Sequence, residues 1–362
     1  MIILIAFFAF SNLNTPCALQ HWIKIEKVEV TVGKTVYHFP WIIAGKLNPI
    51  DCRVSSGIAR IGYALRFHSG QFLPFIYRAP AKGEINLYVN NETSMQYLSS
   101  VDKVKTNLDK IQVFLLKLKA KGIIPVVIAV PTKVSIEREM ISNLHPPDLW
   151  LPAEQAEEAS EAVYSRIRGI DPVSMVNLYK AFSDAQKNKT EFDRVFVPWD
   201  YHWSIYGIAI AVKETLKSLN NQGVSVSNIQ IKKGDIRSLN MGDAFIVWHQ
   251  LPAWYVQRQK DFSWKEYEYP VEAHISQKIK GRVFLAGTSF SDRYGQDPFG
   301  LPMQLKHVLN VDFYNTTVSG GGVDKSIEKA WSLPKPPVAG DILIWEFPIT
   351  VLFQEKLELP NI

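Results

Sequence analysis

Two short stretches, far apart in the chain, carry side chains that could perform nucleophilic catalysis together. The first, residues 199–203, contains Asp200 and His202, and the second, residues 287–291, contains Ser289. A serine hydroxyl becomes a good nucleophile when a base takes its proton, and the base works best when a third group fixes its tautomer. We therefore predict that Ser289 is the nucleophile, His202 the general base and Asp200 the residue that orients His202.

The surroundings of these residues favour this arrangement. An apolar run at residues 283–286 predicts a strand that leads through Gly287 into a turn carrying Ser289. A nucleophile on such a turn exposes its oxygen and brings its own backbone N–H near a developing oxyanion. Residues two apart in an extended segment point the same way, so we expect Asp200 to orient His202 with its Nε2 facing the serine.

Further residues are candidates for the oxyanion hole or for substrate contacts: Gly320, Gly321, Gly322, Arg293, Tyr294 and Trp203. Three successive glycines predict a tight turn, and its backbone N–H groups could complete an oxyanion hole. Arg293 and Tyr294 follow the serine and could contact substrate, although an exposed charge is the simpler interpretation for Arg293. Trp203 is by default a core or rim residue, with a stacking wall for a sugar as the alternative.

Other kinds of site are less well supported. A Gly-x-Ser turn is common, and an Asp-x-His pair by itself is more often structural or part of a metal site. However, the sequence has no Walker loop, no Gly-x-Gly-x-x-Gly after a strand and no His-Glu-x-x-His. Its two cysteines, Cys17 and Cys52, form no cluster with zinc spacing. We therefore predict no metal.

The elements that must position these residues alternate between helix and strand from about residue 100 onward. We expect strands at residues 123–130, 194–197, 282–286, 311–318 and 341–347, and helices at 101–118, at 152–187 with a break near 169–172, from the cap Ser204 to 219, after Pro302 and up to Trp331. The section 223–280 reads as less regular. This alternation predicts an α/β fold, a mainly parallel sheet with helices on both faces. Ligands bind at the carboxyl ends of such strands, and all three candidate stretches follow a predicted strand.

The chain has 362 residues and a formal net charge of +5. No basic stripe is interleaved with stacking aromatics, so an anionic polysaccharide or a membrane surface is a better partner than nucleic acid. Residues 1–10 are apolar but too few to span a bilayer, and we predict a signal peptide or short anchor over residues 1–18. Residues 19–90 read as a β-rich or irregular segment, and residues 91–362 as the α/β domain.

The two stretches also resemble a known family. Residues 200–204 with Gly207 are similar to the Asp-x-His-Trp-[Ser/Thr]-x-x-Gly signature of the alginate O-acetyltransferase (AlgJ/AlgX-like) group of the SGNH hydrolase superfamily. Residues 287–291 are similar to its Gly-Thr-Ser-[Tyr/Phe]-Ser block, and the Asp/His pair precedes the serine, as in that group. Pro-Thr-Lys at residues 131–133, the triple glycine and Ile-Trp-Glu-Phe-Pro at residues 344–348 also resemble it.

This resemblance implies an SGNH hydrolase-like fold and an exported or periplasmic enzyme of exopolysaccharide maturation. Ser289 would accept an acetyl group as a covalent ester and pass it to a polysaccharide hydroxyl. A membrane-bound O-acyltransferase partner would supply the acetyl group, and the serine needs no soluble cofactor. Two alternatives remain: a carbohydrate esterase or deacetylase with the same triad, and a non-catalytic polysaccharide-binding component of a secretion complex.

Overall fold

The computed structural model describes the backbone of five strands between residues 27 and 89. It also describes residues 101–137, 153–188, 192–198, 200–239, 264–320, 322–354 and 357–362. Contacts divide the chain into two units, residues 1–74 with 240–262 and residues 75–239 with 263–362. The predicted signal segment, both cysteines, Trp199 and Gly321 lie outside the described residues.

Short strands precede the main α/β region. In the first unit β1 (Lys27–Val32) pairs antiparallel with β2 (Thr35–Pro40), and β3 (Gln71–Leu73) follows. In the second unit β4 (Ile76–Ala81) pairs antiparallel with β5 (Glu84–Val89). Valines at every second position predicted the first of these strands.

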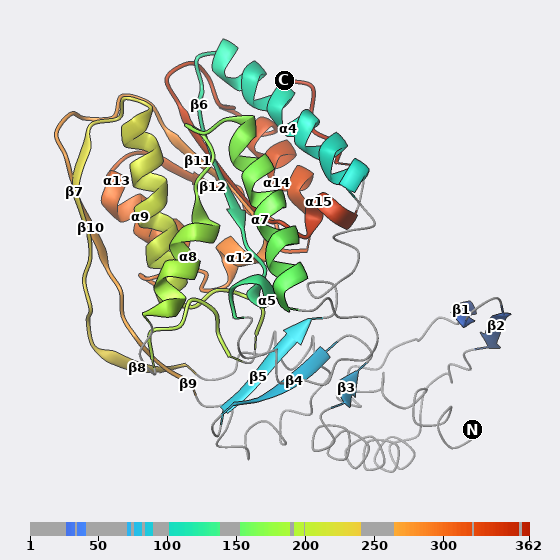
Figure 1. Ribbon diagram of the computed structural model, residues 1–362. Coiled ribbons are helices and arrows are strands. Elements are labelled where there is room, and N and C mark those ends of the chain that lie inside the picture. Colours follow the sequence, from blue (N-terminus) through green and yellow to red (C-terminus); the bar gives the residue numbers. More distant parts are fainter. Residues whose placement is uncertain are drawn as a thin grey trace, which may run out of the picture. The chain divides into compact units, whose positions relative to one another are not determined.

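A parallel four-stranded sheet forms the centre of the second unit (Figure 1). Its order is β12 (Phe313–Asn315), β11 (Val283–Ala286), β13 (Ile342–Pro348) and β6 (Ile124–Val130). All three pairings are parallel. Four of the five predicted strands therefore exist, although β12 is shorter than the stretch 311–318 that was expected.

Helices cover both faces of this sheet. Alternate residues of each strand enter two separate hydrophobic cores, as the two-residue period of a strand requires: in β11, for example, Val283 and Leu285 join one core, and Phe284 and Ala286 the other. The first core is closed by α8 (Leu178–Lys187), α9 (Ile205–Asn221) and α13 (Leu301–Leu309), and the second by α4 (Val101–Ala120), α7 (Ala153–Ile170), α14 (Gly322–Trp331) and α15 (Val351–Gln354). Figure 1 shows α9 and α13 on the opposite side of the strands from α4 and α14. The predicted fold class is confirmed.

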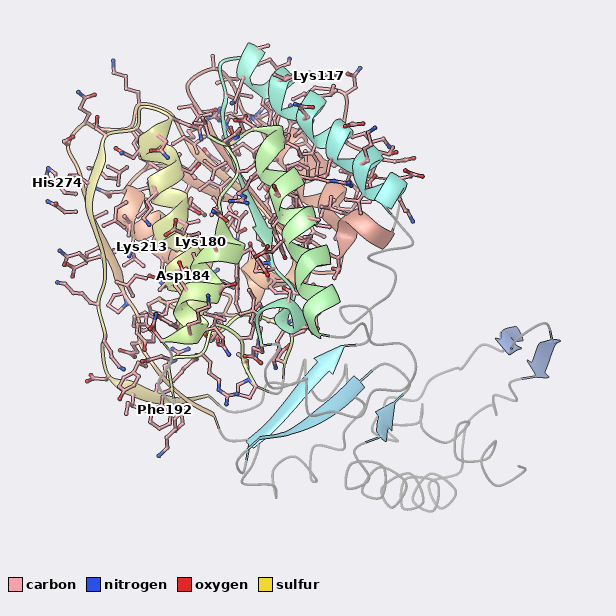
Figure 2. The ribbon with its side chains drawn as sticks, viewed as in Figure 1. Lys117, Lys180, Asp184, Phe192, Lys213 and His274 are labelled. Atoms are coloured by element: carbon pink, nitrogen blue, oxygen red, sulfur yellow. The ribbon has the colours of Figure 1, made fainter. Side chains whose placement is uncertain are left out.

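The section 223–280 is more regular than its sequence predicted. Two antiparallel pairs lie within it, β7 (Val226–Ile231) with β10 (Val271–Ile275) and β8 (Ile236–Leu239) with β9 (Trp264–Tyr267). Most residues of β7 and β10 are at least partly exposed, so these strands lack the apolar pattern that marks a buried strand. His274 lies on the outer side of β10 and is exposed (Figure 2). Among the described helices, none is long and apolar enough to cross a bilayer.

Candidate active site

Asp200 and His202 lie in a tight reversal of the chain, and the strand predicted at residues 194–197 is wrong. Only one isolated bridge forms there, between Phe196 and Trp203. Inside it the Asp200 N–H donates to the Val197 carbonyl at 3.2 Å, and the Val197 N–H donates to the His202 carbonyl at 3.1 Å. The pair is therefore presented by a loop, and the residues before it form this isolated bridge in place of a strand of the sheet.

The imidazole of His202 nevertheless bridges the two stretches. Its Nδ1 lies 2.8 Å from Asp200 Oδ1, and its Nε2 lies 2.9 Å from Ser289 Oγ. The Asp200 and His202 side chains are buried, and Ser289 is partly exposed. The three side chains that the sequence singled out therefore meet, with the geometry that a nucleophile, a base and an orienting carboxylate require.

Ser289 occupies a sharp turn after β11. Thr288 caps α12 (Ser289–Asp292), and its hydroxyl accepts the N–H of Phe290 at 3.3 Å. Gly287 is required by close contact, since an added Cβ would lie 2.4 Å from Ser291 Oγ and 2.9 Å from Glu346 Oε2. The absence of a side chain at position 287 thus lets the chain turn tightly enough to present the serine.

Arg293 pairs with the far side of Asp200. Its Nε lies 3.0 Å from Asp200 Oδ2, and the interpretation of Arg293 as an exposed charge is wrong. Burial by itself would raise the pKa of Asp200, but His202 and Arg293 outweigh it and hold the pKa of this carboxyl well below its usual range. Asp200 is therefore an ionised acceptor for His202.

Trp203 and Tyr294 contact protein groups. Trp203 is completely buried and its Nε1 donates to the Phe290 carbonyl at 2.8 Å, so a substrate contact for Trp203 is wrong. The Tyr294 hydroxyl donates to Glu266 at 3.3 Å, and burial next to that carboxylate raises the pKa of Tyr294. Trp203 joins the Asp/His loop to the residue after Ser289, which explains its place in the signature.

The glycine-rich turn lies next to the serine turn. The Val318 N–H donates to the Gly287 carbonyl at 2.9 Å, which ties the chain after β12 to the chain after β11. Gly320 is exposed and has a φ of +72°, a conformation that favours glycine, and Gly322 begins α14. An oxyanion-binding role for Gly320, Gly321 and Gly322 stays a prediction.

Two buried charges beneath the site were given no role from the sequence. Lys133 begins α5 (Lys133–Ile136) just after β6, and Glu346 lies near the end of β13. Their signal was present in the sequence, because each follows or closes a buried strand at the edge where ligands bind. Within the described part of the chain, no group of three His, Cys, Asp or Glu side chains could hold a metal ion.

Comparison with known proteins gives one family and a shared fold. Residues 87–349 match the family described as the SGNH hydrolase-like domain of the acetyltransferase AlgX. The structure is similar to the O-acetyltransferase domain of Pseudomonas putida AlgJ, with a TM-score of 0.51 and 18% identity over 74% of this chain and 90% of that one. For Pseudomonas aeruginosa AlgX the TM-score is 0.49 and the identity 21%, over 76% of this chain and 63% of that one. No curated protein sequence matches the chain.

At 18% identity, the similarity to the AlgJ domain is evidence for a shared fold and not for a shared function. The family match is more informative, because it spans well over half of the chain and includes Asp200, His202 and Ser289. This chain belongs to the family of the SGNH hydrolase-like domain of the acetyltransferase AlgX.

Proposed function

We propose that this protein is an O-acetyltransferase that acetylates a secreted exopolysaccharide through an acetyl ester of Ser289. The observation that carries the proposal is the bridging imidazole of His202, with Nδ1 2.8 Å from Asp200 and Nε2 2.9 Å from Ser289. Membership of an acetyltransferase family supports acetyl as the transferred group.

In the first half-reaction Ser289 takes the acetyl group from an acetyl donor. Because Asp200 is ionised, Nδ1 of His202 carries the proton and Nε2 is free to accept the proton of the serine hydroxyl. Oγ then attacks the acetyl carbonyl carbon, and the Ser289 proton moves to Nε2. The tetrahedral intermediate collapses when the donor oxygen leaves with that proton, and acetyl-serine and neutral His202 remain.

In the second half-reaction a polysaccharide hydroxyl replaces the donor. His202 Nε2 takes its proton while the sugar oxygen attacks the acetyl-serine carbonyl carbon, and Ser289 Oγ leaves and recovers the proton. Backbone N–H groups of Ser289 itself and of the turn at residues 320–322 are the proposed donors to the oxyanion in both halves. Asp200 stabilises the imidazolium formed in each half without accepting its proton.

The proposed partners follow from the same chemistry. A membrane-bound O-acyltransferase would deliver the acetyl group, because nothing in the reaction of Ser289 itself generates an activated acetyl donor. The protein would act in the periplasm or outside the cell, where secreted polysaccharide is available. The resemblance of residues 200–204 and 287–291 to the alginate O-acetyltransferase group makes alginate the first acceptor to test.

Mass spectrometry of Ser289 tests the covalent step. The protein is exposed to an activated acetyl ester, p-nitrophenyl acetate, with and without alginate oligosaccharides. We expect acetyl on Ser289 in the wild type, none in Ser289→Ala, and acetylated sugar only when the wild type and sugar are both present. Ester hydrolysis without any acetylated sugar would instead establish an esterase. Unchanged acetylation of polymer in cells carrying Ser289→Ala would establish a non-catalytic component.

A further inference from the structure

We propose that Glu346 and Lys133 are positioning residues for the two halves of the triad: Glu346 fixes the turn that carries Ser289, and Lys133 fixes the loop that carries Asp200 and His202. We refer to them as the strand-end charges. Their effect on rate rests on the proposed acyl chemistry of Ser289, whereas their effect on geometry does not.

Glu346 binds the serine turn on both sides of the nucleophile. Its Oε2 accepts the backbone N–H of Thr288 at 2.8 Å, the N–H of Ser291 at 3.2 Å and the Ser291 hydroxyl at 2.7 Å. Its Oε1 accepts the Thr288 hydroxyl at 3.0 Å. These donors belong to the residue before Ser289 and to the second residue after it, so the backbone at Ser289 is fixed from both directions.

The serine turn is in close contact with the carboxylate of Glu346. Glu346 is completely buried, and a Cβ at Gly287 would lie 2.9 Å from Oε2. Removing the carboxylate would leave four buried donors without an acceptor, and each unpaired donor costs about 1–3 kcal/mol. The turn would then move to find other acceptors, and Ser289 would move with it.

The side chain of Lys133 binds the backbone of the loop that carries Asp200 and His202. Its completely buried Nζ donates to the carbonyls of Val197 at 2.8 Å, Pro198 at 2.5 Å and Asp200 at 3.1 Å. An ammonium group has three donors, and three carbonyls of one loop accept them. Because these carbonyls lie at and just before Asp200, the lysine fixes where the loop turns.

Glu346 lies in β13, and Lys133 follows the neighbouring strand β6 as the first residue of α5. β13 pairs with β6, and Pro348 lies opposite Val130 at their carboxyl ends. The contact between His202 Nε2 and Ser289 Oγ joins residues 87 positions apart. No single helix or strand contains both residues and sets the distance between them. We infer that the pairing of β13 with β6 sets it, because Glu346 and Lys133 tie the two stretches to these strands.

Substitution of the strand-end charges tests this assignment. Glu346→Leu removes both carboxylate oxygens and keeps a side chain of similar volume. Glu346→Gln keeps one oxygen that can accept hydrogen bonds. Lys133→Met removes the three donors. The measurement is the rate of Ser289 acetylation by p-nitrophenyl acetate, followed by nitrophenolate release and by mass. A displacement of about 1 Å costs about 10²-fold in rate, so we expect losses of that order for Glu346→Leu and Lys133→Met. Glu346→Gln should restore part of the rate.

A matched control lies next to the other end of the strand that carries Glu346. Asp341 precedes β13 at its other end, is also buried, and accepts the Arg282 backbone N–H at 2.8 Å. Asp341→Asn should lower the thermal midpoint but keep the wild-type rate. In a His202→Ala background Glu346→Leu should have little further effect, because there is no longer a base for Ser289 to align with.

Crystal structures of the variants give a readout that needs no reactivity. We expect the distance from Ser289 Oγ to His202 Nε2 to exceed hydrogen-bond length in Glu346→Leu or Lys133→Met. If Glu346→Leu does not fold, Glu346→Gln is judged by the same distance and rate. Wild-type rates together with an unchanged distance in folded variants would overturn the assignment. A wild type that acetylates Ser289 but never a sugar would contradict the proposed function and leave this assignment intact.

Discussion

At the scale of single residues, Asp200 makes more contacts than an orienting carboxylate needs. Its Oδ1 accepts both Nδ1 and the backbone N–H of His202, at 2.8 and 3.2 Å, and its Oδ2 pairs with Arg293 at 3.0 Å. Each contact favours the ionised carboxylate. In the proposed mechanism, ionised Asp200 keeps the His202 proton on Nδ1, so that Nε2 faces Ser289 as a base.

We expect Asp200→Asn to slow acetylation of Ser289 by about 10³–10⁴-fold, because an amide no longer selects that imidazole tautomer. The measurement is the burst of nitrophenolate from p-nitrophenyl acetate. Asp184→Asn is the control, since Asp184 is an exposed side chain of α8 that pairs with Lys180. If the acetylation rate of Asp200→Asn is within tenfold of the wild-type rate, Asp200 is not the residue that orients His202.

At the scale of elements, α9 anchors the Asp/His loop. Ser204 caps this helix and accepts the Gly207 N–H at 3.1 Å, and the Ser204 hydroxyl donates to the Arg194 carbonyl. The first turn of α9 lies so close to the preceding chain that a Cβ on Gly207 would be 2.3 Å from the Val195 carbonyl oxygen. The end of the signature, Ser204 and Gly207, therefore serves the packing that positions His202.

Gly207→Ala should destabilise the protein by about 1–3 kcal/mol through overpacking, and should slow Ser289 acetylation because the loop shifts. Gly169→Ala is the matched control in α7, where an added Cβ meets nothing within 4 Å. It should be neutral or stabilising by up to about 1 kcal/mol. Urea denaturation compares the two, and equal effects would contradict the close contact at Gly207.

At the scale of the whole α/β unit, the sheet separates two cores whose buried side chains are distinct, and partly buried Tyr179 packs against both. Leu216 of α9 is buried in one core, and Leu118 of α4 is buried in the other. Each is completely buried. Mutations on opposite faces of the sheet should therefore act independently.

Leu216→Ala and Leu118→Ala should each cost about 2–5 kcal/mol of unfolding free energy. The double variant should equal the sum within about 0.5 kcal/mol, because the two leucines are buried in different cores. Calorimetry or urea denaturation of the four proteins checks this. A coupling clearly larger than that would mean that the sheet transmits repacking between the cores.

The stability of the molecule should respond to pH with opposite signs at two buried carboxyls. The pKa of Asp200 is lowered on folding, so its contribution is present above its unfolded pKa of about 3.9 and is lost as the pH falls below it. Burial raises the pKa of Glu346 against the opposing hydrogen bonds from Thr288 and Ser291. Its contribution is present below its unfolded pKa of about 4.3 and is lost as the pH rises toward the folded pKa.

Urea denaturation between pH 3 and pH 7 therefore separates the two groups. The stability difference between wild type and Asp200→Asn should grow as the pH rises from 3. The difference between wild type and Glu346→Gln should shrink over the same rise. Parallel curves for the two variants would contradict the assigned directions of the pKa shifts.

The sequence by itself determined much of this protein. Largely apolar runs predicted β6, β11 and β13, because both faces of these strands are buried. Apolar residues at helical spacing predicted α4 and α9, and Ser204 marked where α9 begins. The same local chemistry, with the family resemblance, singled out Asp200, His202 and Ser289.

The tertiary structure decided what depends on contacts between distant residues. The exposed strands β7 and β10 carry no apolar signal, and the reversal at residues 197–202 is imposed by its bridge and by Lys133. The pairing of Arg293 with Asp200, the burial of Trp203 and the carboxylate of Glu346 beneath Ser289 each join segments far apart in sequence. Residue types show which groups can react, but only the folded sheet determines which of them lie within hydrogen-bond distance.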